Sequence, residues 1–554
     1  MTAVRNTDRT PDRERIARRR LRRRVALLGA CGLLLTAPSA AWPDTPAVTR
    51  SAGADGTGTD AAVPPGLRRY HQQKLLWESC PGTPSFQCAT LKVPLDYAHP
   101  DAGDLLLTAT RKKATGTGAR IGSLLVNPGG PGGSAIDYLV GGGADLFSPS
   151  VRASYDLIAM DPRGVQYSTP VDCGLNTATT SSGVGRHMSA DSAKIAALEE
   201  VFEQFTDACA RHAGRLLPHL GTLDAARDMD VLRALLGDDR LHYLGFSYGG
   251  YLGATYADLF PSRVGRMVLD GAIDPALDAY QVVLQNAAGY QVAWESFAAD
   301  CAARPDCPLG HSVEEISRGL DTVRRSLDRV PLRQGKDITI TGDSLLSAVT
   351  IGLKAPEWAL LRDALRGLQA GDTTALQQLL GSAEDTSSNA TEAHYAISCL
   401  SSPLAPRFTS AEVRAALRQL LNASPQFGEF HAPRLMQCAH WPVPPAQPAR
   451  LVSAPGAAPV LVVGTTRDPA TPYAWSKALA GQLASSRLLT YDGDGHLAYQ
   501  SGSDCVDTAV DRYLTLGRLP HVGTICPGAS PSAPVTAAMP RPEPGGVRGT
   551  STNP

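Results

Sequence analysis

The sequence predicts an α/β fold, a mostly parallel sheet with helices on both faces. Short, continuously apolar segments recur along the chain, alternate with helical segments, and are typical of buried strands in a parallel sheet. These segments are 121–126, 155–160, 241–246, 266–269, 459–464 and 487–491. Glycine-rich or polar residues follow several of them directly. Because the carboxyl ends of parallel strands share one edge, we expect a functional site at that edge.

An antiparallel hairpin and a helical insertion complete the predicted architecture. Segments 87–95 and 105–111 have strand-like apolar patterns around a turn-rich connection, which predicts the hairpin. From 274 to 449 the pattern changes, and buried strand character returns only afterwards. The helix-like stretches are 287–301, 313–327, 343–368 and 411–421. We therefore expect a core in two parts, 70–273 and 450–526, separated by a large helical cap over 274–449.

The two ends of the chain have the composition of processed or disordered segments. An arginine cluster at 18–24 precedes the apolar run Val25 to Leu35 and the small residues Ala37 to Ala41, which is the order of a secretory signal. A membrane anchor is the rival, but this run is about half of the ~20 residues that a spanning helix needs. The expected segments are a signal peptide over 1–41, a flexible leader over 42–69 and a disordered tail over 527–554. The predicted location is extracellular or at the cell surface, without a stable membrane span.

The cysteines point to structural disulfides. Of 11 cysteines, Cys31 lies in the predicted signal, and an even set remains, as an oxidising compartment favours. Sequence alone does not fix the connectivity. Proximity along the chain suggests Cys80 with Cys88, Cys173 with Cys209, Cys301 with Cys307, Cys399 with Cys438 and Cys505 with Cys526. No C-x-x-C or H-E-x-x-H spacing is present, so no metal and no organic cofactor are expected, and a net charge of −1 gives no electrostatic case for nucleic acid.

A serine nucleophile is predicted at Ser247. The segment from Leu241 to Ala257 combines a short apolar strand, the turn Gly245-Phe246-Ser247-Tyr248-Gly249 and a small-residue helix. A sharp turn of this kind holds the serine hydroxyl above the sheet, where both a base and a substrate can reach it. A pentapeptide of this pattern also occurs by chance in long chains. The motifs around it must therefore decide whether Ser247 is a nucleophile.

An acid and a base follow later strands in the order that such a serine requires. Asp468 follows the strand that ends at Val463, and His496 follows the strand that ends at Tyr491. In a triad, the histidine takes the serine proton and the carboxylate orients the imidazole. Asp270, after the strand that follows the nucleophile helix, is the competing acid. Thr471 either steadies Asp468 or is a plain turn hydroxyl.

The glycine-rich segment that ends at Ser134 predicts a site for the oxyanion of the tetrahedral intermediate. Gly129 or Gly130 can present a backbone amide there, and the amide of Tyr248 is expected to supply another. A phosphate-binding loop is the rival, but neither G-x-x-x-x-G-K-[ST] nor G-x-G-x-x-G is present. Arg163 either binds a substrate carboxylate or clamps two loops together inside the protein.

These motifs together resemble a known family. They are Asn127 to Ser134, Asp161-Pro162-Arg163-Gly164, Gly245 to Gly250, Cys438 to Pro442, Asp468 and Gly495-His496. In this order they resemble the secreted bacterial tripeptidyl aminopeptidases, relatives of the prolyl iminopeptidases within the α/β-hydrolase fold. The resemblance covers roughly Leu75 to Cys526.

The resemblance implies a serine exopeptidase that releases short peptides from free N-termini under a helical cap. It also implies an acid in or beside the cap that pairs with the substrate's α-ammonium group. After Cys399, where relatives carry an acid, this chain has Leu400-Ser401-Ser402. Glu392 is the nearby alternative, although it could equally be a solvated helix residue.

The expected function is therefore that of a secreted serine exopeptidase, which hydrolyses peptide bonds near free N-termini through Ser247, His496 and Asp468 and an acyl-enzyme. Its partners are peptides with a free N-terminus. A secreted esterase or lipid hydrolase with the same triad is the first alternative. The second is a non-catalytic binding protein on this fold, which predicts the loss of a triad residue.

Overall fold

The computed structural model describes residues 64–174, 192–334, 338–354, 358–382 and 389–528. All of them belong to one compact unit. The predicted signal peptide, most of the leader and nearly all of the tail lie outside the described residues. In the described ranges, no helix is long and apolar enough to cross a membrane.

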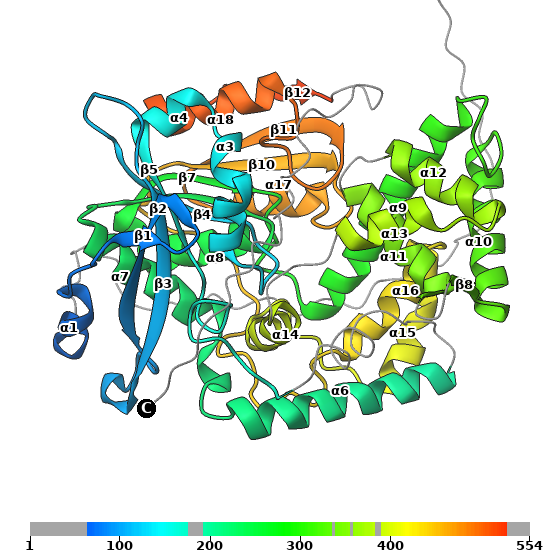
Figure 1. Ribbon diagram of the computed structural model, residues 1–554, viewed down its shortest axis with the longest axis horizontal. Coiled ribbons are helices and arrows are strands. Elements are labelled where there is room, and N and C mark those ends of the chain that lie inside the picture. The colour runs from blue at the N-terminus through cyan, green and yellow to red at the C-terminus, as the bar shows by residue number, and fades with distance from the viewer. Residues whose placement is uncertain (1–63, 175–191, 335–337, 355–357, 383–388, 529–554) are drawn as a thin grey trace, which may run out of the picture. The chain divides into compact units, whose positions relative to one another are not determined.

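A ten-stranded mixed sheet forms the core, in the order β1-β2-β3-β5-β4-β6-β7-β10-β11-β12 (Figure 1). The strands β1, β2, β3 and β5 pair antiparallel, and every other neighbouring pair in the sheet is parallel. The bounds are β1 Glu78–Cys80, β2 Thr83–Pro94, β3 Asp104–Lys112, β4 Gly122–Asn127, β5 Tyr155–Met160, β6 Leu241–Phe246, β7 Val264–Asp270, β10 Val460–Arg467, β11 Ser486–Asp494 and β12 Ile525–Pro527. The predicted α/β fold and its opening hairpin are confirmed.

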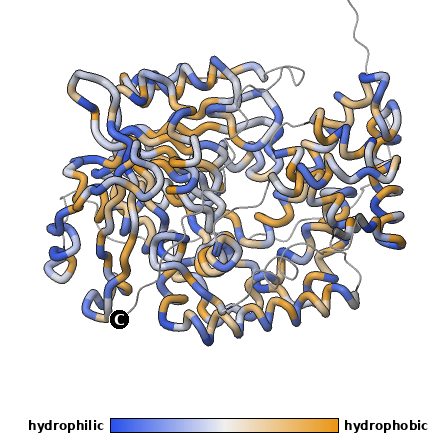
Figure 2. The backbone as a smooth tube through the Cα atoms, in the orientation of Figure 1, coloured by the Kyte–Doolittle hydropathy of each residue, from blue (hydrophilic) through white to orange (hydrophobic). Residues whose placement is uncertain are grey.

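Both faces of the sheet are buried, which explains why its strands are apolar without alternation. In β10, Val460 and Val462 belong to one apolar cluster, whereas Leu461 and Val463 belong to another. In Figure 2 the backbone tube has the colour of hydrophobic residues along much of these strands. Helices α7 (Thr222–Leu236), α8 (Tyr248–Leu259) and α17 (Tyr473–Gln482) contribute to the first cluster, and α4 (Pro149–Ser154) and α18 (Asp504–Leu516) to the second.

A helical segment with its own apolar core lies between β7 and β10 in the chain. Trp294, Phe297, Trp358 and Phe427 are buried together in it. Its elements are α9 Ala279–Ala302, α10 Val313–Arg329, β8 Leu332–Gln334, β9 Ile338–Ile340, α11 Gly342–Lys354, α12 Trp358–Gln369, α13 Thr374–Ser382, α14 Ala390–Leu400, α15 Ser410–Ala423, α16 Gly428–His431 and the short helix η6 Ala432–Met436.

This helical segment, together with a helix that contacts it, is called the helical layer below. Two of its features differ from the sequence prediction. The stretch expected to be helical over 343–368 contains two helices, α11 and α12, on either side of residues 355–357, which lie outside the described ranges. Helix α6 (Ser192–Ala213) was not predicted and contacts α15 and η6. The layer therefore includes a helix from a part of the chain that the sequence analysis assigned to the core.

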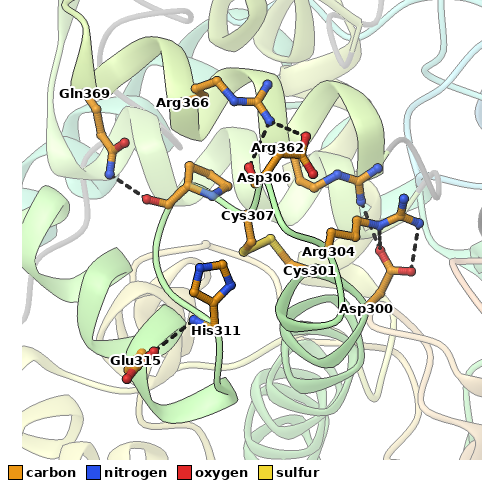
Figure 3. The surroundings of a disulfide bond; sticks show 11 residues. Asp300, Cys301, Arg304, Asp306, Cys307, His311, Glu315, Arg362, Arg366 and Gln369 are labelled. Carbon is orange, nitrogen blue, oxygen red and sulfur yellow. Dashed lines mark hydrogen bonds and ion pairs between the residues drawn. A yellow bond between two sulfur atoms is a disulfide. The ribbon is translucent and has the colours of Figure 1, made fainter.

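Five disulfides connect the ten cysteines, and each joins the pair that proximity suggested. They are Cys80–Cys88, Cys173–Cys209, Cys301–Cys307, Cys399–Cys438 and Cys505–Cys526. Figure 3 shows Asp300 next to the third of these, with Arg304 and Arg362 each 3.0 Å from its carboxylate. Because Asp300 lies on α9 and Arg362 on α12, this cluster fixes the two helices against each other near the disulfide.

Arg163 is an internal clamp and not a substrate-binding residue. Its side chain is fully buried, and the guanidinium donates to both carboxylate oxygens of Asp228, at 2.7 and 2.6 Å. It also donates to the carbonyls of Pro94, Leu95 and His219. A guanidinium has five N–H donors, and these contacts use all of them. The prediction that Arg163 binds a substrate carboxylate is therefore wrong.

Arg163→Ala should destabilise the protein by about 3–5 kcal/mol, because it leaves the carboxylate of Asp228 buried and unpaired. Arg366→Ala is the matched control, since Arg366 pairs with Asp363 on the surface and exposed pairs contribute about 1 kcal/mol or less. Urea unfolding at neutral pH measures both changes. Equal losses for the two variants would contradict the assignment of Arg163 as a clamp.

Candidate active site

Ser247 lies in the turn between β6 and α8, with φ 55° and ψ −119°. A positive φ is uncommon for a residue other than glycine and is found where the surrounding structure enforces it. Here the enforcement comes from close backbone contacts. A Cβ on Gly245 would lie 2.3 Å from the Gly249 carbonyl oxygen, and a Cβ on Gly249 would lie 2.6 Å from that of Asn127. The glycines therefore allow the close packing that holds the serine in this turn.

His496 and Asp468 form a tight pair beyond the ends of β11 and β10. The imidazole Nδ1 of His496 lies 2.9 Å from Oδ2 of Asp468. The amides of Ala470 and Thr471 and the Thr471 hydroxyl also donate to this carboxylate, at 2.8, 2.8 and 2.9 Å. Since the ionised carboxylate only accepts, the pairing places the imidazole proton on Nδ1 and leaves the Nε2 lone pair for a proton from elsewhere. Of the two possibilities for Thr471, the structure supports the one in which it steadies the acid.

Asp270 connects the serine turn to the histidine loop. Its carbonyl accepts the amide of Ser247 at 2.8 Å, and its carboxylate accepts the amides of Ala498 and Tyr499 at 3.0 and 2.8 Å. Because this carboxylate is used by amides while His496 contacts Asp468, the structure disfavours Asp270 as the orienting acid. Burial raises the pKa of Asp270 to about 7.

Among the described residues, no hydrogen bond joins the Ser247 hydroxyl to His496. In structures without substrate this contact is often long, so its absence does not exclude proton transfer between the two groups. Asp270 nevertheless fixes the loop of Ser247 against the loop of His496. It accepts the amide of Ser247 itself and two amides that closely follow His496 in the chain. Transfer of the serine proton is part of the function proposed below.

The glycine-rich loop lies against the serine turn, and only one of its two candidate amides is available. A Cβ on Gly129 would lie 3.0 Å from Cβ of Ser247 and 3.1 Å from the Tyr248 amide nitrogen, so the loop and the turn are in contact. However, the Gly129 amide donates to Oδ1 of Asn127 at 3.0 Å. The Gly129 amide therefore already has an acceptor. The amides left for an oxyanion are those of Gly130 and of Tyr248, the first residue of α8, which has no acceptor within its own helix.

Asp161 fixes the end of the glycine-rich loop through hydrogen bonds. The Ser134 hydroxyl donates to both of its carboxylate oxygens, at 2.9 and 3.0 Å, and the amides of Ile136 and Tyr167 donate to it as well. Asp161 is fully buried, and burial raises its pKa to about 7. The first residue of the Asp161-Pro162-Arg163-Gly164 motif thus positions the loop.

The helical segment contacts the site at three places that the sequence did not reveal. Nδ1 of His394, on α14, lies 3.0 Å from the carbonyl oxygen of Pro131 in the glycine-rich loop. The amide group of Asn286, on α9, donates to the carbonyl of Ala470 at 2.6 Å, and the carbonyl of Lys354 accepts the amide of His496 at 2.7 Å. No local pattern marks these residues, because each contact joins positions far apart in the chain.

Neither predicted position presents an exposed carboxylate to a substrate ammonium group. Oε1 of Glu392 accepts the amide of Cys173 at 3.2 Å, and the side chain is buried in that contact. Ser401 follows α14, and its hydroxyl lies 2.7 Å from that of Thr222, which in turn lies 2.8 Å from the Tyr248 phenol. Ser401 and Thr222 thus connect the helical layer to Tyr248 on α8, and neither side chain carries a charge.

A cavity of about 1290 Å³ lies beside the face of α8 that carries Tyr251, Thr255 and Leu259. None of Ser247, Asp468 and His496 lines it, so it is not the place where the chemistry proposed below would occur. In the part of the chain that the structure describes, no group of three His, Cys, Asp or Glu side chains could hold a metal ion.

Asp270→Asn should change how stability depends on pH. Its pKa is raised from 3.8 to about 7, so between about pH 4 and 7 the folded state keeps a proton that the unfolded state has lost. More protons bound to the folded state mean that this group lowers stability as the pH rises through that window. Asparagine has no such proton, so the stability of the variant relative to wild type should increase from pH 5 to pH 8, on the order of 2 kcal/mol.

Urea unfolding of both proteins at the two pH values measures this change. Other titrating groups, such as His394 with its pKa lowered by burial to about 4, are common to both proteins and cancel. A difference between variant and wild type that is the same at pH 5 and pH 8 would show that Asp270 does not titrate in this way.

Comparison with known proteins identifies the family. A family model described as TAP-like protein matches residues 424–526. The serine protease Hip1 of Mycobacterium tuberculosis is 37% identical, over 79% of this chain and 87% of that protein. Carboxylesterase B of the same species is 36% identical over 89% and 96% of the two chains, and the tripeptidyl aminopeptidase of Streptomyces lividans is 30% identical over 92% and 99%. The resemblance expected from the sequence is confirmed, and the chain belongs to the tripeptidyl aminopeptidase-like family of serine hydrolases with the α/β-hydrolase fold.

Proposed function

We propose that this protein is a secreted serine exopeptidase that hydrolyses peptide bonds near free N-termini. The observation that carries the proposal is the His496–Asp468 pair, held by Asp270 against the turn that carries Ser247. Relatives named serine protease and tripeptidyl aminopeptidase support a peptide as the substrate.

The proposed reaction is acyl transfer to water. Ser247 Oγ attacks the peptide carbonyl while Nε2 of His496 takes its proton, and the proton then passes to the leaving amine. Asp468 stays ionised and stabilises the imidazolium through Nδ1. The amides of Gly130 and Tyr248 donate to the oxyanion of each tetrahedral intermediate, where fixed donors stabilise developing charge. Water then releases the acyl group by the same steps.

Export from the cytoplasm is part of the proposal. Five disulfides are typical of a protein that folds in an oxidising compartment. The arginine cluster, apolar run and small residues at the start of the chain have the order of a secretory signal.

Ester hydrolysis is the second candidate function, because a relative with 36% identity is named Carboxylesterase B. The same triad would hydrolyse an ester by the same steps, since an alcohol leaves more readily than an amine. An ester substrate needs no free N-terminus. The dependence on that N-terminus therefore separates the two functions.

Peptide anilides with a free or an acetylated N-terminus test the proposal. We expect the purified mature protein to release aniline from the free tripeptide anilide at least about tenfold faster in kcat/KM, because acetylation removes a charge that an exopeptidase site recognises. Equal turnover of the two anilides, together with efficient hydrolysis of simple esters, would favour the esterase.

Ser247→Ala is the control for this experiment. We expect it to lower kcat for every substrate by about 10³- to 10⁶-fold without loss of the folded state, because the nucleophile is removed while the rest of the site remains. Thermal unfolding checks that the variant is folded. Full activity in this variant would mean that another residue forms the acyl-enzyme.

A further inference from the structure

Arg434, on η6, is a partly buried cation without a carboxylate partner in the ranges that the structure describes. Its Nη1 donates to Oδ1 of Asn286 and lies 3.4 Å from Nδ1 of His431. Arg163, the buried clamp, is by contrast paired with Asp228 at 2.6 Å. Removing a guanidinium from water without a counter-charge is costly, and proteins normally pair such a group.

A second donor, next to Arg434, has no acceptor among the described residues. His431 is 3% exposed, and its Nε2 has no hydrogen-bond partner among the described residues. Because a guanidinium can only donate, Nδ1 of His431 must accept from Arg434, which assigns the ring proton to Nε2. The ring stacks on Tyr290 at 4.9 Å between centroids, and burial and the neighbouring cations hold its pKa well below the usual value. It is therefore a neutral donor.

The surroundings of these two donors are positive. Burial lowers the pKa of both His394 and His431, and the charges of Arg434 and Lys354 lower it further. Within the described ranges, no carboxylate is among the groups that shift either pKa. The groups that act on Arg434 itself are the phenols of Tyr290 and Tyr395. In the described part of the chain, this region therefore holds cations and neutral donors but no anion that pairs with them.

The same groups lie beside the proposed catalytic machinery. Asn286, which accepts from Arg434, donates to the carbonyl of Ala470, two residues after Asp468. His394 contacts the glycine-rich loop at Pro131, and the carbonyl of Lys354 accepts the amide of His496. Arg434 thus contacts the acid loop through one intervening residue, Asn286. Its charge also lowers the pKa of His394, which contacts the glycine-rich loop.

We propose that Arg434 and His431 bind the carboxylate of a glutamate or aspartate side chain in the part of the peptide that becomes the acyl group. This inference rests on the proposed function and names its preferred substrate class. In an enzyme that releases short N-terminal peptides, the acyl part is the short piece under the helical layer, while the rest of the polypeptide leads away to solvent. Residues of that layer therefore contact the acyl part.

Tripeptide anilides with glutamate or glutamine at each of the three positions in turn, and alanine elsewhere, test the inference. We expect glutamate to be preferred at one position by about 10- to 100-fold in kcat/KM, the range of a hydrogen-bonded charge pair. Arg434→Gln should remove this preference, so that the glutamate and glutamine anilides at that position are hydrolysed with equal kcat/KM. Arg434→Lys should keep part of it, because the charge remains while the planar, two-pronged contact is lost.

Arg414→Gln is the matched control, since it removes the charge of an exposed arginine on α15 in the same helical layer. It should leave the glutamate preference unchanged. Wild type that hydrolyses the alanine and glutamine anilides without preferring glutamate would overturn this inference and leave the exopeptidase in place. Arg434→Gln that slows both members of a pair equally would assign Arg434 a positioning role through Asn286, and the inference would again be wrong.

The anilides have no C-terminal carboxylate, so the preference they report comes from the side chain. A parallel set of peptides with a free or an amidated C-terminus covers the other source of a carboxylate. One outcome would contradict the side-chain assignment. In it, wild type shows no glutamate preference in the anilides but prefers the free C-terminus, and Arg434→Gln removes that preference. If wild type hydrolyses none of the peptides, the proposed exopeptidase function itself fails.

Discussion

Everything in the candidate site depends on one buried carboxylate, that of Asp270. Its backbone carbonyl holds the amide of Ser247, and its side chain holds two amides of the loop that follows His496. The group is fully buried and its pKa is raised, so the protein accepts an energetic cost at this position. In return, the loop of Ser247 after β6 and the loop of His496 after β11 are held at a fixed distance from each other. Asp161 fixes the oxyanion loop in the same way, through Ser134.

The helical layer takes part in the site and does not merely cover it. Asn286, His394 and Lys354 each hold a loop that carries a proposed catalytic group, and all three come from helices between β7 and β10. Movement of these helices would therefore displace the acid, the oxyanion donors and the base together. Arg434 adds a positive charge to this layer where the sequence-based resemblance implied a negative one.

Much of the fold could be predicted because its signals are local. Apolar runs marked the strands, and each proposed triad residue directly follows a strand, so its place in the chain indicated its place in space. The choice between Gly129 and Gly130 could not be made, because it depends on where the Asn127 side chain points. Arg434 was missed because its partner Asn286 lies 148 residues earlier, and no local pattern encodes such a contact. The two alternatives for Arg163 likewise differ only in its burial, which packing decides.

That Ser247 is the activated nucleophile is tested most directly by reaction with a fluorophosphonate, which phosphonylates an activated serine with loss of fluoride, followed by peptide mapping in a mass spectrometer. We expect one adduct in the folded protein, on the peptide that contains Ser247, and none after denaturation. The reason is that activation requires His496 and Asp468 to be held as they are in the structure. An adduct on a different serine, or no adduct on folded protein that hydrolyses peptides, would contradict the proposed mechanism.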